Sequence, residues 1–274
     1  MKLTFIEPNE ELKPYIQSLW VFESQVGMPP AQSNLAAPNG CSKLIVPYEN
    51  SVTSIADGRV QESYEQGLYF VGNRDSSTLL STRPRKTGFI GIEFHPYGAY
   101  PVFGIPMSET TNRLLTADAL FGKWGENVRE VLRNETTVDR KVDQLQRFLV
   151  DSLRSRNLQN PLINFCVSAL KSTNGLISIR ELERKTGYSR RYLEILFKNH
   201  VGLPPKAMAG IFRFQKFYQK WAAGVPFEEI REQLYDYYYD QAHFTKAFKK
   251  MTTFSPEHFI LEVSNEFGRR LSLH

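Results

Sequence analysis

Apolar residues follow two different patterns along the chain. Before residue 105 they form short runs that are rich in β-branched and aromatic side chains. These runs are separated by residues typical of turns, at intervals of roughly ten to fifteen residues. The runs are Leu19–Phe22, Leu44–Val46, Leu68–Val71 and Gly88–Phe94, and the turns are Pro38-Asn39-Gly40, Asp57-Gly58, Gly72-Asn73 and Arg83-Pro84. This pattern predicts that residues 1 to about 105 are mostly β, in a compact antiparallel sheet, sandwich or barrel.

From Thr116 onward the apolar spacing is helical. Thr116 is a predicted N-cap, and helices are expected around Trp124–Leu132 and over an apolar stripe with 3–4 spacing. The stripe consists of Val138, Val142, Leu145, Phe148, Leu149 and Leu153. Such a stripe favours burial within its own domain, although a long amphipathic helix at the end of a domain is also a common face for homodimerisation.

The polar segment Ser152–Gln159 is the expected linker between two domains. After Pro161 the chain is almost wholly helical, and Gly175 is expected to end a helix over Leu162–Ser172. We therefore predict an α+β chain in which residues 1–155 form a mostly β domain followed by helices. Residues 160–274 are predicted to form an all-α domain.

Composition excludes several classes of protein. The chain has 274 residues, of which 41% are hydrophobic and 23% are charged, so disorder, collagen and coiled coil are excluded. Only Cys41 and Cys166 are cysteines, which favours a reducing cytoplasm over a disulfide framework. Glu7 and Glu10 interrupt the start of the chain, and no run reaches eighteen apolar residues, so neither secretion nor membrane insertion is expected.

The positive charge is concentrated in the predicted helical domain. Residues 1–159 contain 17 Lys and Arg against 18 Asp and Glu, whereas residues 160–274 contain 17 against 11. Between Arg180 and Lys220 there are ten basic residues and three acidic ones. A local excess of this kind attracts a polyanion, and it is also typical of a solvated helical surface or of a face that docks an acidic protein.

Two stretches of this basic half correspond at an offset of 51 residues. In each copy a capping residue, Ser189 or Asp240, opens a helix whose buried side is an i, i+4 pair of large apolar residues. The matched positions are Ile179 with Ile230, Leu193 with Phe244, Phe197 with Phe248, Lys198 with Lys249, and Pro205 with Pro256. Each copy is therefore predicted to hold a short amphipathic helix on a scaffold.

The first copy has the pattern of a helix-turn-helix. Ser178 caps a helix through Thr186, Gly187-Tyr188 forms a tight turn, and Ser189 caps a second helix to about Asn199. The residues predicted to face inward are Leu182, Leu193, Leu196 and Phe197, and those predicted to face outward are Arg190, Arg191, Glu194, Ile195 and Lys198. Arg at the N-terminal end of such a helix can reach guanine, whereas Lys198 at the far end suits a phosphate.

Four stretches of the helical half are the most specific ones: residues 187–193 (GYSRRYL), 197–206 (FKNHVGLPPK), 213–215 (RFQ) and 240–249 (DQAHFTKAFK). Through them, residues 160–262 resemble the DNA-binding domain of the AraC/XylS-type bacterial transcription regulators. The resemblance implies two helix-turn-helix units joined by a long helix, with recognition helices in successive major grooves. The DNA-binding residues expected by resemblance or by exposed position are Arg190, Arg191, Glu194, Ile195, Lys198, Gln241, Ala242, Thr245, Lys246 and Lys249.

The sequence departs from this family pattern at several positions. Ile195 and Gly210 stand where many members carry Arg, so base preference cannot be copied from the family. The second unit lacks the usual turn glycine and offers Asp236 as the residue that tolerates the left-handed conformation, and Thr253 replaces the counterpart of Gly202. Whether the second unit reads bases therefore stays open.

The family resemblance also implies the role of the front half. Such regulators join the DNA-binding domain to a sensing or dimerising domain that is often a cupin-like β-barrel, and residues 89–100, 104–109 and 119–122 are similar to an uncharacterised front domain of this kind. The implied partners are double-stranded promoter DNA, with RNA polymerase, a small-molecule effector and a second copy of the chain as further candidates. No cofactor is expected.

Candidate ligand residues in the front half are few. His95 is the only histidine before residue 160, so a metal site of the His-rich cupin type is not expected. Glu93, His95 and Tyr97 could line a ligand pocket, although a single histidine beside a proline at a strand end is also typical of a local hydrogen-bonding residue. Four basic residues at strand ends could read an acidic effector, although basic residues in such places are usually just solvated. They are Arg74, Arg83, Arg85 and Lys86.

Catalytic motifs are missing from the sequence. It contains no G-x-S-x-G, P-loop, G-x-G-x-x-G, H-E-x-x-H or C-x-x-C pattern, so an enzyme is not expected. The main hypothesis is a sequence-specific transcription regulator with two reading helices. The alternative is a ligand- or protein-binding module whose basic helical half docks an acidic protein.

Overall fold

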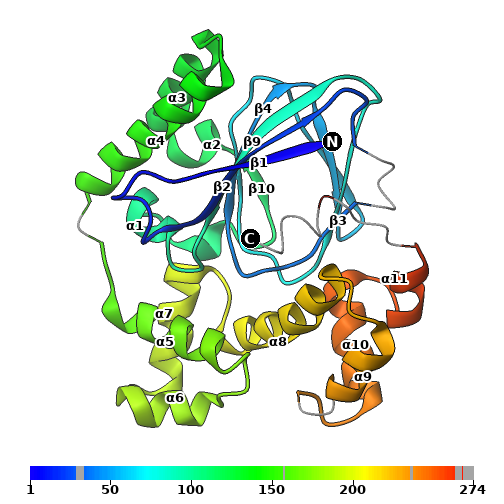
Figure 1. Ribbon diagram of the computed structural model, residues 1–274. Coiled ribbons are helices and arrows are strands. Elements are labelled where there is room, and N and C mark those ends of the chain that lie inside the picture. The colour runs from blue at the N-terminus through cyan, green and yellow to red at the C-terminus, as the bar shows by residue number, and fades with distance from the viewer. Residues whose placement is uncertain (29–33, 157, 235–236, 263–266, 268–274) are drawn as a thin grey trace.

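The computed structural model describes residues 1–28, 34–156, 158–234, 237–262 and 267. Antiparallel sheets come first in the chain and helices follow, as the α+β prediction required (Figure 1). In Figure 1 the sheets lie above a row of helices, in which the long helix α8 (Pro205–Ala222) runs between one group of helices within residues 161–201 and another within residues 227–262.

Two antiparallel sheets form the front domain. The larger sheet has the strand order β1 (Lys2–Ile6), β2 (Ile16–Ser24), β9 (Thr87–Phe94), β4 (Lys43–Glu49), β7 (Tyr69–Val71) and β10 (Leu114–Thr116). The smaller sheet has the order β3 (Leu35–Ala36), β8 (Thr78–Thr82), β5 (Val52–Ala56) and β6 (Arg59–Ser63). All the predicted β runs lie in or next to these strands.

Local residue choice fixes both the pairing and the turns of the sheets. Trp20 on β2 pairs with Gly91 on β9, and a Cβ at Gly91 would lie 2.1 Å from the indole ring, so the ring needs glycine opposite it. Asp57 and Gly58 have φ values of 50° and 74°, which are the left-handed conformations that a two-residue hairpin between β5 and β6 requires.

The helices of the front domain cover its larger sheet. They are α1 (Ala99–Phe103), the 3-10 turn η2 (Met107–Glu109), α2 (Ala117–Phe121), α3 (Lys123–Asn134) and α4 (Val138–Arg154). Thr116 caps α2 by accepting a hydrogen bond from the backbone N of Ala119 at 3.4 Å, as predicted. The stripe on α4 packs into the same core as β2, β4 and β9. It is therefore covered by its own domain and is not a free face for a second copy.

The second domain is wholly helical over its described residues. Its helices are α5 (Pro161–Ser172), α6 (Ile179–Thr186), α7 (Arg190–Val201), α8 (Pro205–Ala222), α9 (Phe227–Leu234), α10 (Gln241–Thr252) and α11 (Pro256–Glu262). Gly175, with φ 72°, follows α5 and packs so closely on α8 that a Cβ would lie 2.0 Å from the carbonyl oxygen of Ala209. Helix α4 runs to Arg154, so it includes the first residues of the predicted linker.

A polar cavity lies where the two domains meet. Its volume is about 250 Å³, and its lining includes Tyr15, His95 and Tyr97 from the front domain and Asn164 and His200 from the helical domain. Burial lowers the pKa of both imidazoles; the charge of Lys171 lowers that of His95 further, and hydrogen bonding to backbone atoms partly opposes both shifts. Both histidines are therefore held in the neutral form at the domain boundary.

This cavity predicts a loss of stability in mild acid. The folded chain binds protons at His95 and His200 more weakly than the unfolded chain, so their contribution is present above the unfolded pKa of about 6.5 and is lost as the pH falls toward the folded values. We expect the free energy of unfolding to fall between about pH 7 and pH 5.5, and to fall less steeply in a His95→Asn, His200→Gln double variant. Urea unfolding across this range measures both slopes. His243→Gln, at an exposed site, is the control, and equal slopes in the double variant and the wild type would contradict the assignment.

Helices α7 and α10 end in the same backbone conformation with different residues. Gly202 after α7 has φ 88°, and Thr253 after α10 has φ 69°. A β-branched residue is strained in this region, whereas glycine is not. The two helix ends that correspond in the repeat therefore differ: the backbone after α7 is unstrained at Gly202, and the backbone after α10 is strained at Thr253.

The two helix ends predict stability changes of opposite sign. Thr253→Gly should raise the free energy of unfolding by about 0.5 to 1 kcal/mol, because relief of the left-handed strain exceeds the added freedom of glycine in the unfolded chain. Gly202→Ala should lower it, because its Cβ would lie 2.9 Å from the carbonyl oxygen of Met107 and from Thr111 Oγ1. Both changes are measured as shifts in the midpoint of urea unfolding at an unchanged m-value. A lower midpoint for Thr253→Gly than for the wild type would show that Thr253 is not strained.

Candidate DNA-binding surface and front-domain cavity

The first helix-turn-helix unit is formed by α6, the turn at Gly187 and α7. Ser178 opens α6 with a capping box, in which Ser178 Oγ accepts from the backbone N of Glu181 at 3.2 Å and Glu181 Oε2 accepts from the backbone N of Ser178 at 2.8 Å. Gly187 ends α6 with φ 76°, and Ser189 Oγ caps α7 by accepting from the backbone N of Tyr192 at 3.3 Å. The predicted starts and turn are confirmed, and α7 extends two residues further than predicted, to Val201.

Helix α7 presents a polar face to solvent. The predicted outward residues are exposed except Glu194, which is half-buried, and the predicted inward residues are all buried. Arg190 Nε donates to Glu194 Oε1 at 2.9 Å, an exposed i, i+4 pair of the kind that contributes little to stability. Among the described residues Arg191 and Lys198 make no ion pair. Two cations on this face are therefore available to an anionic partner.

Two tyrosines extend this face toward the turn. Tyr188 and Tyr192 stack with ring centroids 4.7 Å apart, and they are 46% and 43% exposed. The prediction from sequence did not include them, although their i, i+4 spacing across Ser189 was a signal. Their rings and hydroxyls add apolar area and donors beside Arg191.

The second unit is formed by α9 and α10. Asp240 Oδ1 caps α10 by accepting from the backbone N of His243 at 2.7 Å, and Phe244 and Phe248 are buried as the repeat predicted. Gln241, Ala242, Lys246 and Lys249 are exposed, and Thr245 is half-buried. Asp236, the predicted turn residue, lies outside the described residues.

The C-terminal end of α7 is buried against the front domain. Asn73 Nδ2 donates to the carbonyl oxygen of Val201 at 2.7 Å, and Thr111 Oγ1 donates to that of Gly202 at 2.7 Å. The ring of Tyr100 on α1 lies 4.2 Å from that of His200. These contacts satisfy carbonyls that the end of a helix leaves unpaired, so they fix α7 to the front domain.

Helices α8 and α10 also touch the front domain. Gln215 Nε2 donates to the carbonyl oxygen of Pro38 at 2.6 Å, and Lys250 Nζ lies 2.9 Å from Asp75 Oδ2. Burial works to raise the pKa of Asp75, but hydrogen bonds from Lys250 and Asn112 outweigh it and hold that pKa below its ordinary value. Asp75 therefore stays ionised as the partner of Lys250.

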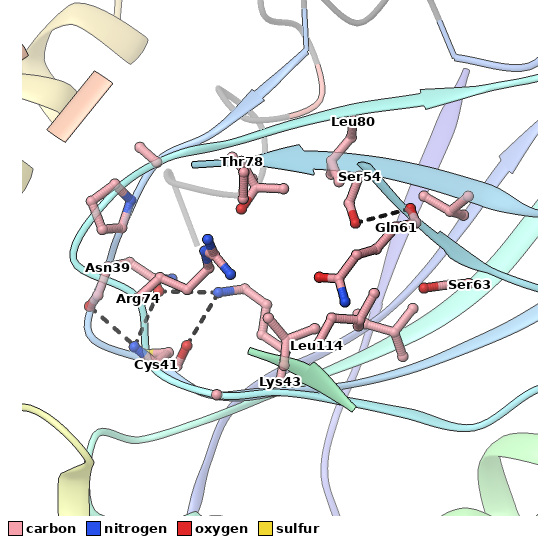
Figure 2. Close-up of a pocket in the computed structure, with 18 of the residues that line it drawn as sticks. Asn39, Cys41, Lys43, Ser54, Gln61, Ser63, Arg74, Thr78, Leu80 and Leu114 are labelled. Atoms are coloured by element: carbon pink, nitrogen blue, oxygen red, sulfur yellow. Dashed lines mark hydrogen bonds between the residues drawn. The ribbon is translucent and has the colours of Figure 1, made fainter. Parts of the chain in front are cut away.

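A cavity of about 110 Å³ opens inside the front domain. Its apolar lining includes Trp20, Ile45, Leu80, Phe89 and Phe267. Figure 2 shows Arg74 and Lys43 at one end, beside Asn39 and Cys41, and Ser54, Gln61 and Ser63 at the other. An apolar space with a few polar groups at its ends is the usual form of a small-molecule site.

The two cations of this cavity differ in how fully they are paired. Lys43 Nζ contacts Glu93 Oε1 at 3.1 Å, Asn39 Oδ1 at 3.1 Å and the carbonyl oxygen of Cys41 at 3.3 Å. Arg74 Nη2 contacts Asp57 Oδ2 at 3.0 Å and Nη1 donates to the carbonyl oxygen of Asn112 at 2.9 Å, but its buried Nε has no hydrogen-bond partner among the described residues. Arg74, which lines the cavity, thus has one buried donor without a partner in the described part of the chain.

The three predicted ligand residues of the front half do not come together. Glu93 is buried and binds Lys43, Ser18 and Asn39, and it is not part of the cavity lining. His95 and Tyr97 stack at 5.9 Å and line the cavity between the domains instead. The reason is that Glu93 lies within β9 and faces β2 and β4, whereas the other two lie beyond the end of that strand. Of the four basic residues predicted at strand ends, Arg74 lines the front-domain cavity, whereas Arg83, Arg85 and Lys86 are exposed and do not line it.

Other reactive groups are few in the described part of the chain. Burial raises the pKa of the Cys41 thiol to about 12 and that of Cys166 to about 11, so both are protonated. Within the residues that the structure describes, no group of three or more His, Cys, Asp and Glu could hold a metal ion. None of the described helices is both long and apolar enough to cross a membrane.

Comparisons with known proteins agree with this architecture. Residues 4–116 match the family described as a domain of unknown function, DUF6597. No curated protein matches the chain. The structure of ToxT from Vibrio cholerae, an AraC-family regulator, is 11% identical over 92% of this chain and 100% of that chain, with a TM-score of 0.50. A structure of ToxT with an unsaturated fatty acid bound is 10% identical over 94% and 98%, with a TM-score of 0.47.

At this level of identity the similarity establishes the fold. The order of antiparallel sheets followed by helices, in two domains, is shared with ToxT. The chain therefore has a two-domain fold similar to that of ToxT, and residues 4–116 of its front domain match DUF6597.

Proposed function

We propose that the chain is a sequence-specific transcription regulator that binds double-stranded promoter DNA with α7 and α10. The observation that carries this proposal is the repeat itself: two units of matching construction, each with buried apolar backs and an exposed basic helix, lie on either side of α8. Helices presented in pairs suit successive major grooves of a duplex.

The five residues of α7 that were predicted to face outward each have a role that their chemistry suggests. Arg191, one residue into the helix, is long enough to bind guanine O6 and N7 with two hydrogen bonds, and Glu194 can accept from cytosine N4. Ile195 suits a thymine methyl group, and Arg190 and Lys198 at the two ends suit phosphates.

The corresponding face of α10 is less charged near its beginning. Gln241 can bind adenine N6 and N7, Ala242 can contact a thymine methyl group, and Thr245 can reach either base edge. Lys246 and Lys249 suit phosphates. This unit is therefore assigned fewer charged base contacts than the first.

The front domain is proposed to control this binding through a small-molecule effector. Its cavity has an apolar interior and a free donor on Arg74, and the same domain holds the ends of α7 and α10. RNA polymerase and a second copy of the chain are further proposed partners of the regulator.

The experiment that tests the function is selection of random double-stranded DNA by the full-length protein at about 150 mM salt, where nonspecific binding is weak. We expect two short motifs spaced about one helical turn apart. An inverted repeat of the pair would indicate a dimer. If no motif is enriched at any salt concentration, the selection is repeated with residues 160–274 alone. Enrichment there would mean that the front domain inhibits DNA binding without its effector, whereas failure there as well would refute DNA reading and favour docking of an acidic protein.

Two substitutions on α7 separate base reading from phosphate binding. Arg191→Ala should weaken binding to the selected site by about 1 to 3 kcal/mol and relax the preference at one base pair. Lys198→Ala should weaken binding to all sequences alike and reduce the slope of log affinity against log salt by about 1. Titrations of selected and scrambled DNA at several salt concentrations measure both effects.

The matched control is Arg147→Ala, which removes an exposed arginine from α4 of the front domain. Its affinity and salt slope should equal those of the wild type. If Arg191→Ala and Lys198→Ala had the same effect on selected and scrambled DNA, the assignment of the two residues would be wrong.

A further inference from the structure

Three consecutive residues after β7 connect the front-domain cavity to both helix-turn-helix units. Asn73 binds the carbonyl oxygen of Val201 at the end of α7, Arg74 lines the cavity, and Asp75 binds Lys250 near the end of α10. The three side chains therefore reach three different parts of the molecule from one short stretch of backbone.

The stretch is held by a second loop. Asn112 Oδ1 accepts from the backbone N of Asp75 at 3.1 Å, and Asn112 Nδ2 donates to Asp75 Oδ1 at 2.9 Å. The backbone N of Asn112 donates to the carbonyl oxygen of Asn73 at 2.9 Å, and the adjacent Thr111 binds Gly202. A displacement of residues 73–75 would thus be shared with residues 111–112 and with both contacts on α7.

Arg74 has an incompletely used binding edge. Nε and Nη2 together form one edge of a guanidinium, to which a carboxylate binds with two parallel hydrogen bonds. Here Asp57 Oδ2 takes only Nη2, and Nε is buried without a partner among the described residues. Figure 2 shows the Arg74 side chain directed into the cavity beside Lys43. A ligand carboxylate at this edge would accept two hydrogen bonds, from Nε and Nη2 of Arg74, whereas Asp57 accepts only the one from Nη2.

We propose that residues 73–75 form a latch that reports the occupancy of the cavity to both helix-turn-helix units. The ligand is an organic anion with an apolar body. Its carboxylate displaces Asp57 and accepts hydrogen bonds from Nε and Nη2 of Arg74. The movement of Arg74 shifts the backbone of its neighbours and loosens the bonds from Asn73 to Val201 and from Asp75 to Lys250. That loosening these bonds would regulate DNA binding rests on the proposed function. The coupling between the cavity and the two helix-turn-helix units does not itself require DNA.

Binding to the latch is tested with 4-fluorobenzoate on the full-length protein, followed by its ¹⁹F NMR signal up to about 10 mM. We expect saturable binding that Arg74→Gln weakens at least about tenfold, because a two-point charged contact is lost. Arg83→Gln, at an exposed arginine after β8, is the matched control and should leave the affinity unchanged. No saturable binding, or equal affinity in Arg74→Gln, would overturn the ligand assignment.

Release of the latch is tested by amide hydrogen exchange in peptides covering residues 198–204 and 247–253. Saturating 4-fluorobenzoate should raise exchange severalfold in both peptides of the wild type and in neither peptide of Arg74→Gln. Asp57→Asn, which weakens the hold on Arg74, should raise exchange in both without ligand. Asn73→Ala should affect mainly the first peptide and Asp75→Asn mainly the second.

The outcomes separate the latch from the proposed function. Binding of the probe without a change in either peptide would overturn the latch and leave DNA recognition as proposed. A response in both peptides from a protein that selects no DNA motif would support the latch and refute the proposed function.

Discussion

Helix α8 is the part of the structure on which the arrangement of both helix-turn-helix units depends. Its buried face belongs to a single core shared by both units: Met208 and Ile211 lie near its beginning, and Phe217 contacts Phe244 and Phe248 of α10 near its end. The same helix touches the front domain, where a Cβ at Gly40 would lie 2.6 Å from Met208 Cε. Because protein cores are closely packed, α8 cannot tilt without disturbing both units and the front domain together.

The helix ends that meet the front domain have a common polarity. In α7 the two carbonyls at the C-terminal end accept hydrogen bonds from Asn73 and Thr111, and in α10 a lysine of the last turns binds Asp75. The N-terminal ends, at Arg190 and Gln241, are exposed. The N-terminal end of a helix carries partial positive charge and unpaired N–H groups, which attract anions. Both helices are thus held at the end that an anion would avoid.

Much of this fold could be predicted from local sequence signals. Ser178, Ser189 and Asp240 cap the helices that were expected of them, and the repeat at an offset of 51 residues placed the buried phenylalanines correctly, because caps and helical spacing act within a few residues. The contacts between the domains could not be predicted in this way. Asn73 and Val201 are 128 residues apart, and an asparagine in a turn gives no sign of a distant partner. Glu93 and His95 were grouped because they are close in sequence, but the end of β9 separates their surroundings.

The two units differ in ways that follow from how each is supported. The first unit has glycine at both left-handed positions, Gly187 and Gly202, and it is tied to the front domain by two buried or half-buried hydrogen bonds to backbone carbonyls. The second unit carries a strained Thr253 and is tied by the ion pair of Lys250, whose side chain is 61% exposed. An exposed ion pair is weak and is screened by salt, whereas buried hydrogen bonds are not. The second unit is therefore the more easily released of the two, and a change in the front domain would free α10 before it frees α7.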